Sequence, residues 1–98
     1  MSPYIESLQR SETKIMYKNQ DINYLGIFGS SARGEAGENS DVDLLVDFDK
    51  TKTFFELADI QKYLEEILGR KVDLVSRKSL KRQLRPYVER DLITVYEK

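Results

Sequence analysis

The sequence contains no cysteine and no histidine among its 98 residues. The absence of cysteine excludes a disulfide framework and a thiolate zinc site. The absence of histidine excludes Ser-His-Asp and Cys-His catalysis, and it leaves no histidine to act as a general base. Any catalysis by this chain therefore depends on carboxylates, metal ions, or the side chains of Lys, Arg, Ser and Tyr.

Long apolar runs are also missing from the sequence. No stretch approaches the roughly 20 residues that are needed to span a bilayer. The first six residues lack the basic and apolar blocks of a secretory signal. A chain of this length favours one domain, residues 1–98, over two. We therefore expect a single-domain cytoplasmic protein without membrane attachment.

The charge is nearly balanced, with a formal net charge of −1, but it is unevenly distributed along the chain. Residues 35–49 contain six acidic residues and no basic residue. Residues 70–90 contain eight basic residues and only two acidic ones. Together, an acidic metal-binding face and a basic C-terminal third suit Mg²⁺ and a polyphosphate.

Residues 27–48 are the most informative stretch, because two apolar runs are joined there by small and polar residues. The first run ends at a Gly-Ser pair, and the second run opens with Asp41 and Asp43. Side chains alternate along a strand, so these two carboxylates point to one face and Val42 and Leu44 to the other. Two carboxylates so close together repel unless a cation lies between them. Mg²⁺, which takes oxygen ligands, fits this need.

The turn between the two runs has the features of an anion site. Gly29 allows the backbone to approach a ligand closely, and Ser30 offers a hydroxyl beside free N–H groups at a helix start. Taken alone, a Gly-Ser turn or an Asp-x-Asp pair usually has no catalytic role. Their order and spacing between two apolar runs instead predict a site for a nucleoside triphosphate and Mg²⁺.

The pattern Gly29-Ser30-x-Ala32-Arg33-Gly34, followed by Ser40-Asp41-x-Asp43-Leu44, resembles the signature of the minimal nucleotidyltransferases. These are small members of the DNA polymerase β-like superfamily, and the resemblance covers nearly the whole chain. It implies a polymerase β-like nucleotidyltransferase fold over residues 1–98. It also implies a third acidic residue on a later strand, and this position falls on Asp73.

Asp73 also follows from the needs of the site, because two metal ions require more than two carboxylates. It lies centrally in an apolar strand, where a buried aspartate is costly unless it is paired or bound to a metal. Asp47 shares the face of Asp43 but lies about 13 Å beyond it at strand rise, which is too far for a common site. A structural Asp73 that is salt-bridged to Lys71 or Arg77 is the alternative.

The expected chemistry is nucleotidyl transfer with ATP as substrate and two Mg²⁺ ions as cofactors. Asp41, Asp43 and Asp73 hold the metal ions, and Asp73 is also a candidate general base. An acceptor hydroxyl displaces pyrophosphate from the α-phosphate.

Gly29 and Ser30 are expected to bind the β- and γ-phosphates of the nucleotide. Arg33 either contacts phosphate or forms an ion pair with Glu35 or Glu38.

The periodicity of apolar residues predicts an α/β (α+β) fold with a small mixed sheet and helices mainly on one face. The short link between the first two strands favours an antiparallel hairpin, and the helical connection between the second and third favours parallel pairing. Strands are predicted at 22–28, 41–48, 71–75 and 91–96. Helices are predicted at 3–18 and 53–68, with a short helix or turn at 30–36. A further helical stretch around 79–90 places Leu80, Leu84 and Val88 inward, and Pro86 shortens or kinks it.

A basic stripe is expected on that last helical stretch, because its cations are spaced at i, i+3, i+4 and i+7. The stripe is either a solvated face or a contact surface for nucleotide, RNA or an acidic partner. Its members are Lys78, Lys81, Arg82 and Arg85.

The resemblance implies that the chain is the antitoxin of a two-component system. It would transfer AMP from ATP to a tyrosine hydroxyl of a HEPN-domain ribonuclease toxin. One alternative is a non-catalytic antitoxin that neutralises the same toxin by binding and occlusion, and a weaker one is a small-molecule nucleotidyltransferase. The expected partners are the HEPN toxin and a nucleoside triphosphate, with no membrane and no direct nucleic-acid binding.

Overall fold

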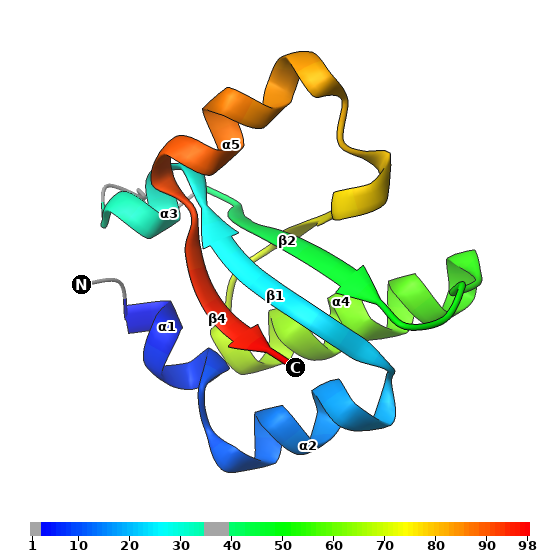
Figure 1. Cartoon of the computed structure of the whole chain (residues 1–98). Helices are drawn as coiled ribbons and strands as arrows, with labels where there is room; N and C mark the ends of the chain where they lie inside the picture. The colour runs from blue at the N-terminus through cyan, green and yellow to red at the C-terminus, as the bar shows by residue number, and fades with distance from the viewer. Residues whose placement is uncertain (1–2, 35–39) are drawn as a thin grey trace.

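The computed structural model describes residues 3–34 and 40–98 of the chain. A four-stranded sheet has the strand order β3-β2-β1-β4 (Figure 1). The strands are β1 (Ile22–Phe28), β2 (Val42–Phe48), β3 (Val72–Ser76) and β4 (Ile93–Glu97). The α-helices are α1 (Pro3–Leu8), α2 (Ser11–Asn19), α3 (Gly29–Arg33), α4 (Phe54–Leu68) and α5 (Arg85–Asp91), and two short 3₁₀ helices are η1 (Arg77–Ser79) and η2 (Arg82–Leu84). None of the helices within the described ranges is long and apolar enough to cross a bilayer.

The sheet is mixed, as the connections between its strands predict. β1 pairs antiparallel with β2 and with β4, whereas β2 pairs parallel with β3. The short α3 connection makes the antiparallel hairpin, and the long α4 crossover makes the parallel pair. Both pairings match the sequence-based expectation.

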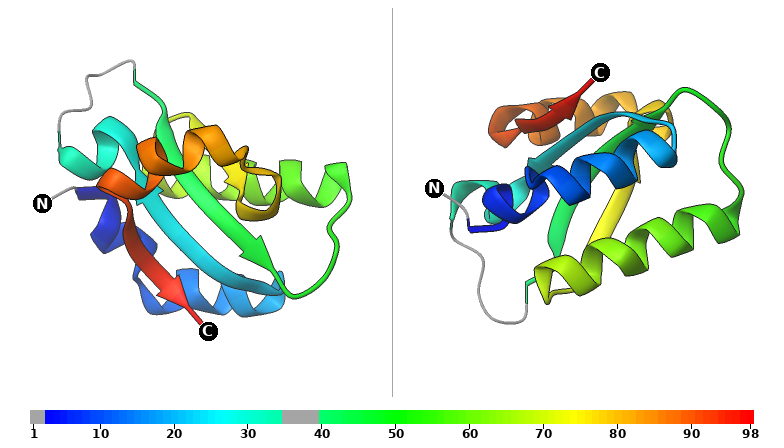
Figure 2. Two further views of the ribbon diagram at one scale, coloured as in Figure 1. Left: turned by 45° about the horizontal axis from the view of Figure 1, so that its top comes forward. Right: turned by 90° about the horizontal axis from the view of Figure 1, so that it is seen from below.

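The two faces of the sheet are covered by different helices. The larger core lies between one face and α1, α2 and α4, and it buries Leu8, Tyr17 and Leu64 completely. The smaller core joins Tyr24 and Leu45 of the sheet to Val88 of α5 on the other face. Figure 2 shows the sheet between α4 on one side and α5 on the other. The helices thus lie mainly on one face, and α5 covers the opposite one.

Helix α4 begins and ends at the residues that the sequence predicts. The Thr53 side chain accepts a hydrogen bond from the Glu56 N–H, and the Glu56 side chain accepts one from the Thr53 N–H, which forms a capping box. Gly69 ends the helix in the left-handed conformation at φ 66°. The apolar stripe of the helix buries Ile60 and Leu64 against the sheet.

The single helix expected at 3–18 is wrong, because the chain forms α1 and α2 with a break between them. Arg10 adopts an extended conformation at φ −64° and ψ 150°. Two buried hydroxyl groups of α2 compensate for the break by donating to carbonyl groups at the end of α1. Tyr17 donates to the Leu8 carbonyl at 2.7 Å, and Thr13 donates to the Ser7 carbonyl at 3.1 Å.

The helical stretch expected around 79–90 is also different from the structure. The chain forms η1, η2 and α5 in succession, and Pro86 lies in the first turn of α5, where its missing N–H is tolerated. Val88 is buried as expected, but Leu84 is 49% exposed and does not point inward. The four predicted basic residues therefore do not form a stripe on one helix.

Candidate active site

Asp43 is the centre of the candidate site, because strand register places residues of both neighbouring strands beside it. It is the register partner of Asp73 in β3 and of Phe28 in β1. Register partners on neighbouring strands share a face of the sheet, so the Asp43 and Asp73 side chains lie side by side. Asp43 is half-buried, whereas Asp73 and Asp41 are exposed.

The charge of Asp43 is unfavourable where it stands. Burial raises the pKa of the Asp43 carboxyl above its ordinary value, and the nearby charges of Asp73 and then Asp41 raise the pKa further. Three carboxylates thus repel one another around a partly desolvated position. A cation placed among them would relieve this repulsion.

Gly29 fits against the Asp43 carboxylate in a way that only glycine permits. Its φ of 70° lies in the left-handed region, which L side chains rarely adopt. A Cβ atom at this position would lie 2.6 Å from Asp43 Oδ2. The backbone at the start of α3 therefore lies directly beside the central carboxylate.

Ser30 and Ser31 connect this turn to the acidic pair. Ser30 is half-buried at the start of α3, next to Gly29. Ser31 is buried, and its hydroxyl donates to the Asp41 carbonyl at 3.3 Å. This bond holds the residue before β2 against α3. The positioning role of Ser31 is not predicted from the sequence, where the small residues around it are the only signal.

Asp73 differs from its prediction in one respect, since it is exposed on the edge strand β3 and not buried. The start of β3 is nevertheless held firmly, because the Val72 N–H donates to Glu65 and the Val72 carbonyl accepts from Gln61 of α4 at 2.9 Å each. Arg77 stacks over the Tyr24 ring, with its guanidinium carbon 3.7 Å from the ring centroid. Among the described residues, no salt bridge joins Asp73 to Lys71 or Arg77.

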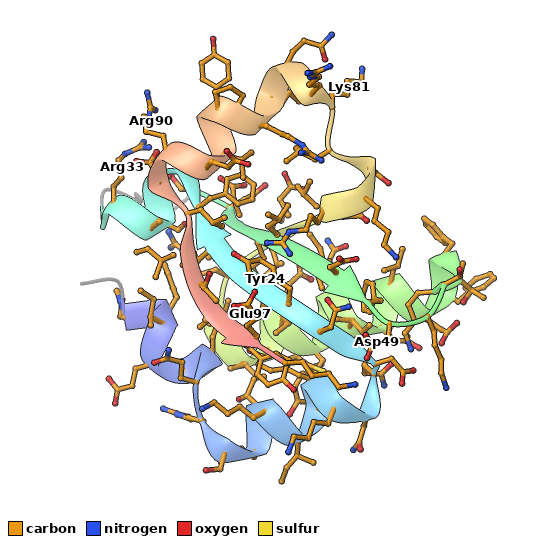
Figure 3. All side chains as sticks on the ribbon, in the orientation of Figure 1. Tyr24, Arg33, Asp49, Lys81, Arg90 and Glu97 are labelled. Atoms are coloured by element: carbon orange, nitrogen blue, oxygen red, sulfur yellow. The ribbon has the colours of Figure 1, made fainter. Side chains whose placement is uncertain are left out.

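Arg33 has a partner that the sequence analysis did not consider. Its guanidinium forms a salt bridge with Asp91 at the end of α5, and Arg90 approaches the same carboxylate at 3.6 Å. Figure 3 shows Arg33 and Arg90 close together at this end of the sheet. The predicted partners Glu35 and Glu38 lie outside the described residues. The observed ion pair links α3 to α5.

Asp47 belongs to the other end of β2, as the strand rise predicts. It accepts from the Phe48 N–H at 2.9 Å and lies 3.9 Å from Lys78 Nζ. It lines a cavity of about 270 Å³ together with Lys50 and Ser79. This cavity lies at the far end of the strand from Asp43, so it is separate from the candidate site.

The three aspartates fit Mg²⁺ by the chemistry of their donor atoms, which are hard carboxylate oxygens. In residues 3–34 and 40–98, no three acidic side chains are already grouped so as to hold a metal ion by themselves. Mg²⁺ in proteins usually takes one or two carboxylates and completes its shell with water and substrate phosphates. Asp41, Asp43 and Asp73 are suited to this shared kind of binding.

Comparison with known proteins agrees with this geometry. Residues 10–95 match the model of the nucleotidyltransferase domain family. The chain is 40% identical over 91 residues to the protein adenylyltransferase MntA of Thermococcus cleftensis, covering 93% of this chain and 92% of that protein. A solved structure described as a minimal nucleotidyltransferase superposes with a TM-score of 0.75 at 38% identity, covering 95% of each chain.

A more distant likeness involves a complex of a tri-AMPylated HEPN toxin from Shewanella oneidensis with an MNT antitoxin. One of its chains superposes with a TM-score of 0.63 at 21% identity, covering 89% of this chain and 70% of that one. At this identity, the likeness shows a shared fold. The match over most of the sequence and the close relative establish the family: this chain is a member of the nucleotidyltransferase domain family.

Proposed function

We propose that this chain is an antitoxin that transfers AMP from ATP to a tyrosine hydroxyl of a HEPN-domain ribonuclease toxin. The observation that carries the proposal is the set of three neighbouring aspartates around Asp43, with the backbone of Gly29 against the central carboxylate. The name of the 40% identical relative and the AMPylated toxin in the Shewanella complex support AMP as the transferred group and a HEPN protein as the acceptor.

Different residues of the site bind different parts of the nucleotide. The turn at Gly29 and Ser30 holds the β- and γ-phosphates, because its backbone N–H groups and hydroxyl are donors to anionic oxygens. Asp41, Asp43 and Asp73 would hold two Mg²⁺ ions together with the phosphates. Mg²⁺ held there would supply positive charge that polarises the phosphate oxygens and lowers the pKa of the acceptor hydroxyl.

The transfer itself is a displacement at the α-phosphorus. A bond forms between the tyrosine oxygen and the α-phosphorus, and the bond from that phosphorus to the bridging oxygen of pyrophosphate breaks. The hydroxyl proton passes to the carboxylate of Asp73, which is exposed to an incoming acceptor. The products are a tyrosine-linked AMP and pyrophosphate.

The direct test uses ATP that carries a radioactive label in either the α- or the γ-phosphate. The acceptor is the purified product of the neighbouring gene, which the proposal expects to be a HEPN-domain toxin. The proposal predicts that the toxin gains label from α-labelled ATP only, in the presence of Mg²⁺. Label from the γ-phosphate would indicate a kinase, and no label from either would contradict nucleotidyl transfer.

A non-catalytic antitoxin is the second candidate, because the described acidic residues do not form a metal site by themselves. Neutralisation by binding predicts that the Asp41→Asn/Asp43→Asn double variant still blocks the ribonuclease activity of the toxin. Neutralisation by AMP transfer predicts that this variant binds the toxin but leaves its ribonuclease active. A ribonuclease assay with equal amounts of each variant separates the two.

A further inference from the structure

The outer side of η2 and α5 combines positive charge with exposed apolar side chains. Lys81, Arg82 and Arg85 are exposed, and none of them forms a salt bridge with a described residue. Leu84 and Tyr87 lie among these cations with 49% and 68% of their surface exposed. We call these five residues the basic–apolar surface.

The cations that precede this surface have contacts within the fold. Arg77 stacks on Tyr24, and Lys78 approaches Asp47 at 3.9 Å. Helix α5 buries Val88 in the smaller core and leaves Tyr87 exposed. The basic–apolar surface thus differs from these two cations, whose side chains already have contacts within the fold.

The surface lies on the same side of the sheet as the candidate active site. Val88 of α5 packs with Tyr24 and Leu45 on the sheet face that also carries Asp43. The end of α5 is joined to α3, the helix that Gly29 begins, by the salt bridge between Arg33 and Asp91. Figure 1 shows α5 beside α3 at this end of the sheet, and Figure 3 shows Lys81 farther from α3 than Arg90.

We propose that the basic–apolar surface docks an acidic, amphipathic segment of the acceptor protein and so brings the acceptor hydroxyl to the site. This inference rests on the proposed function. The three cations, which form no salt bridge with a described residue, complement acidic side chains, and Leu84 and Tyr87 offer contacts to apolar ones. An exposed aliphatic side chain such as Leu84 fits an apolar side chain of a protein better than the charged backbone of a nucleic acid.

The binding test uses a fluorescent random copolymer of glutamate and tyrosine as the acidic probe, at low ionic strength. Neutralising the surface with Lys81→Gln, Arg82→Gln and Arg85→Gln is expected to weaken binding about 10-fold. The matched control neutralises exposed lysines of α2 and α4 on the opposite side of the sheet, with Lys14→Gln, Lys18→Gln and Lys62→Gln. Equal affinity of the two triple variants would overturn the proposal.

The apolar part of the surface is tested with Leu84→Ala/Tyr87→Ala. This variant is expected to bind the copolymer several-fold more weakly. Ile15→Ala is the control, because Ile15 is 58% exposed on α2. A single-stranded RNA of about 20 nucleotides is the competing probe. RNA that binds more tightly than the copolymer, and loses affinity with the same three cations, would overturn docking of an acidic protein segment.

Transfer kinetics with the HEPN toxin connect the surface to function. The triple variant is expected to raise KM for the toxin about 10-fold and to leave kcat and the affinity for ATP unchanged. An equal loss of kcat with unchanged KM would contradict a docking role. Copolymer binding needs no catalysis, so a wild-type chain that binds the copolymer through this surface but transfers no AMP would refute the proposed function alone.

Discussion

The two ends of β2 both carry acidic residues, but the fold surrounds them differently. Just beyond the C-terminal end, Asp49 accepts from Lys98 at 2.7 Å and from Asn23 at 3.0 Å, and these contacts hold its pKa below the ordinary value. At the N-terminal end, burial and then the charges of Asp73 and Asp41 raise the pKa of Asp43. One acidic group is neutralised by the chain, and the other is not.

The difference separates structural carboxylates from candidate functional ones. Lys52 binds Asp21 at 3.0 Å and Glu56 at 3.6 Å, so the C-terminal end of β2 is surrounded by a network of paired charges. Within the described ranges, no salt bridge forms to Asp41, Asp43 or Asp73. We infer that the missing positive charge at this end comes from a bound ligand, which agrees with Mg²⁺.

The largest effect that the difference between the two ends of β2 predicts is on the rate of AMP transfer. Asp43→Asn is expected to lower kcat by at least about 10³-fold, because several kcal/mol of charge stabilisation are lost and each 1.4 kcal/mol is a factor of ten. Asp49→Asn is the matched control and is expected to retain activity. Turnover of Asp43→Asn within tenfold of the wild type would contradict the assignment.

The next effect concerns the glycine beside the central carboxylate. Gly29→Ala forces a Cβ toward Asp43 Oδ2 and is expected to cost about 10²-fold in transfer, as small displacements of catalytic groups do. Gly34→Ala is the control, because Gly34 has a similar φ of 75° and, its chain neighbours apart, no described residue has an atom within 4 Å of the added Cβ. Both variants lose stability through backbone strain, so the difference in activity isolates the contact with Asp43.

Mg²⁺ is expected to bind at the N-terminal end of β2 and not at the C-terminal end, and its binding is expected to stabilise the folded protein. Saturating Mg²⁺ at about 100 times its Kd stabilises a folded protein by about 2.7 kcal/mol, and this raises Tm by several degrees. We expect this increase in the wild type and in Asp49→Asn, but not in Asp41→Asn/Asp43→Asn. A Mg²⁺-dependent Tm increase that survives the double substitution would place the metal elsewhere.

The smallest expected effect is on the pH dependence of folding stability, to which Asp43 and Asp49 at the two ends of β2 contribute with opposite signs. Folding raises the pKa of Asp43 above the model-peptide value of 3.8, so its ionisation destabilises the fold as pH rises past that value. Folding lowers the pKa of Asp49, so its ionisation stabilises the fold above that value, and this contribution is lost as pH falls through the folded pKa.

Thermal unfolding with a metal chelator measures this contrast. At pH 7, Asp43→Asn is expected to unfold at a higher Tm than the wild type, and Asp49→Asn at a lower one. The Asp43 difference is expected to shrink as pH falls and the Asp43 carboxyl is protonated, and the Asp49 difference is lost only at a lower pH, as pH falls through the lowered pKa of Asp49 in the folded state. Shifts of the same sign in the two variants at pH 7 would show that the ends of β2 are not electrostatically different.

Features that depend on neighbouring residues in sequence could be predicted. The alternation of Val42, Leu44 and Val46 predicted β2 and its buried face. Thr53, Glu56 and Gly69 predicted where α4 begins and ends. The helical crossover then required β3 to lie parallel to β2, which brought Asp73 beside Asp43. The placing of the candidate site followed from these local patterns and the connection lengths.

Features that depend on contacts between different helices could not be predicted. The break at Arg10 is compensated by hydroxyl groups of Thr13 and Tyr17 that lie elsewhere on the folded helix pair. Arg33 finds Asp91, which is 58 residues away in the chain. The sequence around Pro86 has helical spacing on both sides, but the chain forms two 3₁₀ helices before α5 begins at Arg85 and buries Val88.

The most direct test of the central claim is intact-mass spectrometry of the HEPN toxin after incubation with this chain, Mg²⁺ and each nucleoside triphosphate in turn. The account predicts that ATP adds one or more AMP groups to the toxin and that the Asp41→Asn/Asp43→Asn variant adds none. An unchanged toxin mass with every nucleotide, in a mixture where the two proteins form a stable complex, would contradict it.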